Sequence, residues 1–279
     1  MNTLPTYQPL IMKLQLLQSL PGRPVRDPLL VSGLVLLALA PVLLVISVLD
    51  QRLLFERSPW DKPLRFALSL GLYGVTMAIA AQWLLQRERL SERSWLLGWR
   101  WLAPLLTATL VFEMTWMATQ AARGLASHFN EATPFEELMF SLMGVGAALL
   151  SLGTLWLGVV ASWLAFGAVN INERLIALGI ALGFVGTGLL LPWTGEALVE
   201  AGRSQSAIEA GTVIPLLGWR LDGSDPRPAH FVAAHMMQVL PVAAIILARY
   251  SQRYRLGVLT AVLFVTTVAG ALFTEWLMP

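Results

Sequence analysis

The sequence predicts an all-α integral membrane protein that forms a single bundle of seven transmembrane helices. The chain has 279 residues, of which 56% are hydrophobic and only 13% are charged, and its mean hydropathy is +0.66. Soluble domains carry about a quarter charged residues. The apolar residues also fall in long continuous runs, whereas the strands of a membrane barrel would alternate apolar and polar residues. Continuous apolar runs indicate helices, which satisfy their own backbone groups in lipid.

Seven runs are long enough to cross about 30 Å of hydrocarbon, which takes roughly 20 helical residues. They are Leu29–Leu49, Leu64–Leu85, Leu97–Thr119, Leu138–Ala165, Leu175–Pro192, Phe231–Ala248 and Leu256–Leu277. Residues 1–28 precede them as a cytoplasmic segment in which apolar positions recur at helical spacing, as in an interfacial amphipathic helix. Residues 29–279 form the transmembrane domain, with an extracytoplasmic loop at 196–227 that we expect to act as a lid.

Local signals predict where several helices begin or bend. Thr133, Pro134 and Glu136 form the pattern of an N-cap, a first-turn proline and a capping-box glutamate. Asp61 is the expected cap of the second span, and Asn172 that of the fifth.

Two further signals concern the fifth and sixth spans. Pro241 predicts a kink and an unbonded carbonyl near Met237 in the sixth span. Gly179, Gly183 and Thr187 are spaced four residues apart in the fifth span, and this stripe of small residues predicts close packing of a neighbouring helix.

The basic residues predict the orientation. With a cytoplasmic N-terminus, eleven of the nineteen lysines and arginines fall on the inside and eight on the outside. We therefore expect a cytoplasmic N-terminus, an extracytoplasmic C-terminus and a multi-pass location in the cell membrane, which in a bacterium is the inner membrane. The net charge of +2 gives no sign of a nucleic-acid partner. The expected partners are membrane lipid and a quinone or another small hydrophobic substrate.

Polar residues within the spans mark a candidate site near the extracytoplasmic face. Glu113 is the only carboxylate well inside an apolar run, and it lies about 10 Å below the end of its helix at Gln120. His235 lies about 10 Å below Pro228, at a matching depth. An ionisable residue within a span usually faces a partner or a cavity.

The remaining candidates lie around this pair. The chain has three histidines, and the predicted topology places all of them, His128, His230 and His235, on the extracytoplasmic side. Gln238 shares a helix face with His235. Lys62, at the start of the second span, is expected to extend its ammonium group to the lipid headgroups.

Three hypotheses fit these residues. The favoured one is a haem- or metal-bearing electron-transfer protein or oxidoreductase, with His128 and His235 as axial ligands of haem b and Gln120 and Gln238 beside the cofactor. This hypothesis ranks narrowly above a zinc-dependent hydrolase or lipid-modifying enzyme.

In the zinc enzyme, His128, His230 and His235 would hold the metal and Glu113 would act as base. Its weakness is that His230 and His235 are five residues apart and do not share a helix face.

The third hypothesis is a non-enzymatic transporter, sensor or assembly factor that uses Glu113 and His235 as a proton relay. The absence of cysteine excludes disulfides, thiolate metal sites and iron–sulfur clusters. The sequence leaves the three hypotheses open.

Overall fold

The computed structural model describes residues 27–54, 57–87, 95–168, 170–203 and 225–249, and six helices account for most of them. They are α2 (Pro28–Leu49), α3 (Asp61–Leu85), α5 (Trp95–Arg123), α6 (Pro134–Gly167), α7 (Ile171–Arg203) and α8 (Arg227–Arg249). An isolated β-bridge between Leu54 and Arg57 is the only strand-like pairing among these residues. The predicted seventh span at 256–277, and all but the end of the N-terminal segment 1–28, lie outside the described residues.

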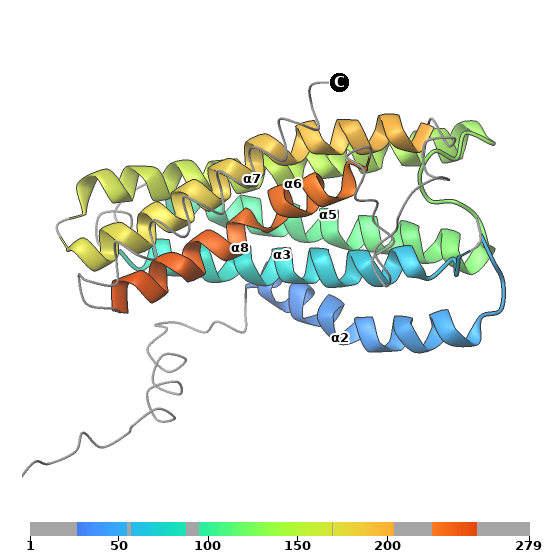
Figure 1. The fold of residues 1–279 in the computed structure, drawn as a ribbon, viewed down its shortest axis with the longest axis horizontal. Coiled ribbons are helices and arrows are strands. Elements are labelled where there is room, and N and C mark those ends of the chain that lie inside the picture. The colour runs from blue at the N-terminus through green and yellow to red at the C-terminus, as the bar shows by residue number, and fades with distance from the viewer. Residues whose placement is uncertain (1–26, 55–56, 88–94, 169, 204–224, 250–279) are drawn as a thin grey trace, which may run out of the picture.

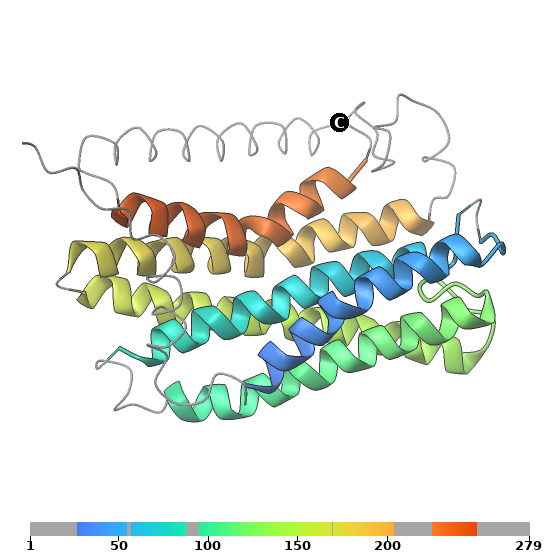
Figure 2. The ribbon, with the colours of Figure 1, turned by 90° about the horizontal axis from the view of Figure 1, so that it is seen from below.

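The helices lie along one long axis and alternate in direction. α2, α5 and α7 run one way and α3, α6 and α8 run the other (Figure 1). α7 packs against both α6 and α8, α2 packs against α3, and α5 contacts α2, α3 and α6. The α2–α3 loop, the α5–α6 loop and the beginning of α8 lie toward one end of the bundle (Figure 2). This end is the one predicted to be extracytoplasmic, and it is called the outer end below.

All six described helices are long and apolar enough to cross a membrane. Large apolar side chains also cover the outside of the bundle: Val35, Val45 and Val159 are each more than half exposed. Apolar surface this extensive is typical of a lipid-facing bundle and is rare on soluble monomers. The described chain is therefore a multi-pass membrane protein with at least six spans, as the composition predicted.

The helix caps match the prediction at one of three positions. The hydroxyl of Thr133 accepts a hydrogen bond from the amide of Glu136 at 3.2 Å, which confirms the predicted cap of α6. The predicted cap of α7 was wrong, because the Asn170 side chain accepts from the amides of Asn172 and Glu173. The predicted cap of α3 was also wrong: Asp61 lies inside the first turn, and its carboxylate accepts from Ser47 of α2.

α7 is longer than predicted. It continues through Pro192 to Arg203 and so occupies the first eight residues of the predicted 196–227 loop. Pro192 removes only one backbone donor, the amide that would bond to the carbonyl of Gly188. A proline within a membrane helix is tolerated where local groups restore the hydrogen bonding.

Close backbone contact joins α2 to α3. A Cβ atom on Gly33 of α2 would lie 2.8 Å from the carbonyl oxygen of Gly71 and 2.8 Å from the amide nitrogen of Val75. Both neighbours are backbone atoms, which cannot move cheaply. Without a hydrophobic force between helices in lipid, such small-residue contacts carry much of the association.

We predict that Gly33→Ala destabilises the protein by about 1–3 kcal/mol, as overpacking does. Gly144→Ala is the matched control, since nothing lies within 4 Å of a Cβ atom at Gly144. Alanine has the higher helix propensity, so the control should be neutral or more stable. The measurement is unfolding in mixed micelles. Equal effects of the two substitutions would contradict the described α2–α3 contact.

Candidate functional site

Glu113 lies between α5 and α6, deep in the outer half of the bundle. Its side chain is 5% exposed, and its Oε1 atom is buried without a hydrogen-bond partner among the described residues. The carboxyl group fits there because α6 has a glycine opposite, and a Cβ atom on Gly146 would overlap Oε1. Thr109, one turn deeper, donates its hydroxyl hydrogen to Leu105 and not to the carboxyl group.

Lys62 is the charged partner of Glu113. It lies in the first turn of α3 and is half-buried, and its ammonium group and the Glu113 carboxylate attract each other. The two groups do not form a direct ion pair, since no nitrogen–oxygen distance of 4.0 Å or less joins them. This pairing was not predicted from the sequence, where Lys62 was expected to extend to the lipid headgroups. The available signal was that the spans contain one lysine and one deeply placed carboxylate.

His128 lies in the α5–α6 loop, against a group of aromatic rings. Its ring is 5.8 Å from Phe140 and 5.9 Å from Phe66, measured between centroids, and its Nδ1 atom is 3.1 Å from the hydroxyl of Ser127. Burial and, to a smaller extent, the positive charge of Lys62 lower the pKa of His128 to about 3, although a hydrogen bond with the backbone of Ser127 opposes them. This imidazole is neutral at physiological pH.

Gln120 belongs to a polar network at the end of α5. Its Oε1 atom accepts from Arg123 at 2.8 Å, and Arg123 forms an ion pair of 3.2 Å with Glu136 at the beginning of α6. The side chain is fully buried, and its Nε2 atom has no partner among the described residues. Gln120 is thus held toward Arg123, and its predicted place beside a cofactor stays a prediction.

The candidate residues of α8 have other neighbours. His230 Nδ1 lies 3.2 Å from the hydroxyl of Thr194 on α7. The ring of His235 packs on Phe231 at 4.2 Å, and Gln238 contacts the hydroxyl of Thr76 on α3 at 3.4 Å.

The predicted site residues therefore fall into separate places. Glu113 and His128 both interact with Lys62, whereas Gln238 reaches Thr76 of α3, His235 packs on Phe231 of its own helix, and His230 faces α7. No described contact joins Glu113 to His235. Within the described ranges, no group of three or more His, Asp or Glu side chains is arranged to hold a metal ion. The three-histidine zinc geometry is thus not formed.

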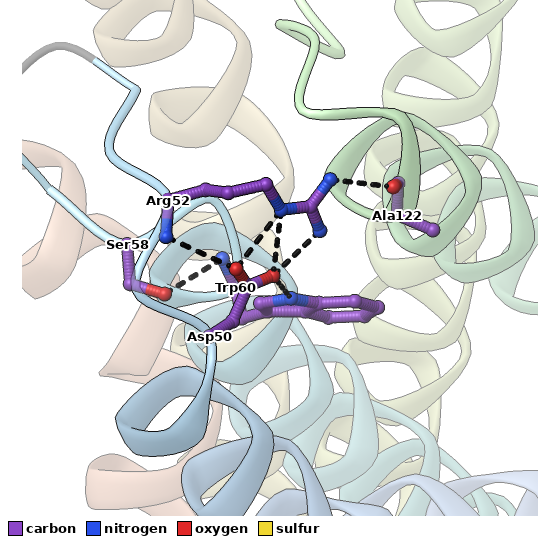
Figure 3. Close-up of polar contacts among 5 residues, drawn as sticks. All are labelled: Asp50, Arg52, Ser58, Trp60 and Ala122. Carbon is purple, nitrogen blue, oxygen red and sulfur yellow. Dashed lines mark hydrogen bonds and ion pairs between the residues drawn. The ribbon is translucent and has the colours of Figure 1, made fainter.

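A second polar cluster, which the sequence analysis missed, fastens the α2–α3 loop to the end of α5. The Arg52 guanidinium donates to both carboxylate oxygens of Asp50 and, at 2.9 Å, to the carbonyl of Ala122 (Figure 3). The indole of Trp60 donates to the same carboxylate at 2.8 Å. The hydrogen bonds from Arg52, followed by that from Trp60, hold the pKa of Asp50 well below its usual range. The carboxylate stays ionised and keeps the loop closed.

The end of α5 also has a well-formed C-cap. Gly124 adopts a φ of 71°, and the amide of Leu125 donates to the carbonyl of Gln120 at 2.9 Å. This left-handed glycine ends the helix in a Schellman arrangement. The cap and Arg52 together fix the start of the loop that carries His128.

No protein-family model matches the chain, and no curated protein or solved structure is significantly similar to it. The candidate function therefore rests on the residues themselves.

We predict that His128 makes stability depend on pH. In the unfolded chain the imidazole takes up a proton near pH 6.5, whereas in the folded protein it does so only near pH 3. Between these values the unfolded state binds more protons, so the protein loses stability as the pH falls from about 6.5 toward 3. His128→Phe keeps an aromatic ring in place and should reduce this slope by up to about 1.4 kcal/mol per pH unit.

The measurement is the free energy of unfolding in mixed micelles at several pH values for both proteins. At pH 7.5 to 8.5 the imidazole is neutral in both states, so the two slopes should agree there and provide the control. Identical slopes below pH 6 would contradict the described burial of His128.

Proposed function

We propose that this is a proton-linked membrane protein, a non-enzymatic transporter or sensor, in which the Glu113 carboxyl group takes up and releases the proton. The observation that carries the proposal is the unpartnered, buried Oε1 atom of Glu113 in the outer half of a membrane helix. An ionisable group is costly there, and such residues commonly mark proton and ion paths. A carboxyl group held only by packing has no structural hydrogen bond to lose when it exchanges a proton.

The position of Lys62 gives the Glu113 side chain a second possible conformation, in which the carboxylate turns toward the ammonium group. The ammonium group attracts the carboxylate without forming a direct ion pair. The ionised form is therefore stabilised by turning toward Lys62, and the neutral form by remaining against Gly146. Proton uptake and a shift of the side chain between α3 and α6 would then be one event.

The surroundings favour a proton over a metal cation. Metal ions take several oxygen or nitrogen ligands at about 2.0–2.6 Å. On the α6 side the carboxyl group faces Gly146, where the atoms nearest an added Cβ atom would be Glu113 Oε1, the methyl group of Thr109 and the carboxyl carbon of Glu113, with no other oxygen or nitrogen among them. A proton needs only the carboxyl oxygen itself.

Of the three histidines, His128 is the one that, like Glu113, interacts with Lys62, but its low pKa keeps it neutral at physiological pH and it does not hold the proton. The relay role predicted for His235 stays a prediction. The zinc hypothesis has no grouped ligands in the described ranges. Haem ligation needs only His128 and His235, but those two rings pack in separate aromatic surroundings.

Infrared difference spectroscopy of the protein in lipid, recorded across a pH titration, tests the proposal. We predict a protonated-carboxyl band that disappears in Glu113→Gln and whose transition moves to another pH in Lys62→Met. Glu137→Gln is the control, because Glu137 is an exposed glutamate in the first turn of α6. It should leave the band unchanged.

Proton flux into proteoliposomes then separates the two forms of the proposal. Flux in the wild type that is lost in Glu113→Gln indicates a transporter, and a titrating band without flux indicates a sensor. A spectrum unaltered by Glu113→Gln would contradict both. A Soret band in the purified protein, lost in both His128→Ala and His235→Ala, would instead support the haem hypothesis.

A further inference from the structure

Thr187 of α7 is inserted into the backbone of α8. Its hydroxyl donates to the carbonyl of Ala233 at 2.7 Å and accepts from the amide of Met237 at 3.1 Å. In an ordinary helix these two backbone groups bond to each other, since they are four residues apart. The Thr187 hydroxyl, which is 1% exposed, thus bridges one step of the α8 ladder.

Other helical threonines of the bundle behave differently. Thr76, Thr107, Thr109 and Thr154 each donate to the carbonyl four residues earlier in their own helix. For Thr187 the equivalent acceptor would be the carbonyl of Gly183. It bonds across to α8 because the stripe of small residues lets the two backbones approach: a Cβ atom on Gly183 would lie 2.7 Å from the carbonyl oxygen of Met236.

α8 bends at the same place. Figure 2 shows that α8 changes direction about half-way along and that its outer half tilts away from α7. Two recognised causes of a helix kink coincide here. The Thr187 side chain bonds to the α8 backbone, and Pro241 has no amide hydrogen to donate to the Met237 carbonyl. Insertion on the face toward α7 lengthens that face, which accounts for the direction of the tilt.

The bend has an alternative that costs no hydrogen bond. If the Thr187 hydroxyl turned back to the Gly183 carbonyl, Met237 could donate directly to Ala233. Each state contains two hydrogen bonds, and in both of them the Ala233 carbonyl and the Met237 amide are paired. In an apolar interior an unsatisfied backbone group is costly, and such a cost would exclude the second state.

We infer that the outer half of α8 is a hinged arm that is latched in its bent position by the Thr187 hydroxyl. The arm carries His230 and His235, so closing and opening the latch moves both imidazoles relative to α7 and α3. The inference rests on the backbone of α8 and does not depend on the proton proposed for Glu113.

Pulsed electron paramagnetic resonance on the full chain in nanodiscs tests the hinge. The sequence has no cysteine, so introduced cysteines can be labelled without background. One label pair, Val232→Cys with Leu142→Cys, spans the outer halves of α8 and α6, and the reference pair, Ile246→Cys with Val159→Cys, spans the inner halves. All four positions are exposed.

Thr187→Val keeps the shape of the side chain but removes the hydroxyl. We expect it to change the outer distance, because the two hydrogen bonds that hold the bend are lost, and to leave the inner distance unchanged. Thr187→Ser keeps the hydroxyl and should retain the wild-type outer distance. Thr187→Ala, which also lacks the hydroxyl, should repeat the result of Thr187→Val.

Two outcomes would overturn the inference. An outer distance that is unchanged in both Thr187→Val and Thr187→Ala would mean that Pro241 alone sets the bend. A serine variant that shifts as far as the valine variant would mean that packing, and not the hydroxyl, holds the arm.

Discussion

Hydrocarbon offers no hydrogen-bond partner, so every polar group within a span has to find one inside the bundle. Most hydroxyl groups solve this locally by bonding to the preceding turn of their own helix. Tyr73 solves it between helices, by donating at 2.9 Å to the carbonyl of Leu150 and so joining α3 to α6. Two groups differ from this pattern: the Oε1 atom of Glu113 has no partner among the described residues, and the Thr187 hydroxyl bonds to both a carbonyl and an amide of the α8 backbone. Both proposed functional features arise from these departures.

The general architecture was predictable because it depends on composition and length. Runs of about 20 apolar residues determine spans wherever the neighbours lie. The Thr133 cap was predictable for a similar reason, since its bonds lie within four residues. The end of α7 was not, because Pro192 is a strong breaker in water and a weak one in lipid. Asp61 failed as a cap because its carboxylate has a better partner, Ser47, on a different helix.

The candidate site was predictable only in part. Glu113 stands out in the sequence because a carboxylate is rare in an apolar run. Its neighbours Lys62 and Gly146 do not, because their importance depends on which helices are adjacent and at which rotation. Depth alone suggested His235 as the partner of Glu113, and depth leaves the angular position around the bundle undetermined. The stripe of Gly179 and Gly183 correctly predicted close packing, but not that Thr187 would enter the partner's backbone.

The Arg52 cluster has a practical consequence for mapping the topology of this protein. Topology is often mapped by inserting epitope tags into loops, and the α2–α3 loop is an obvious choice because it is short, polar and exposed. Here Asp50, Arg52 and Trp60 bond to one another across that loop, and Arg52 also holds the last turn of α5. A tag between Arg52 and Trp60 would separate these groups and release the end of α5, so it would report on a disturbed protein. Single cysteines at exposed loop positions such as Gln51 would read the same topology while the cluster remains intact.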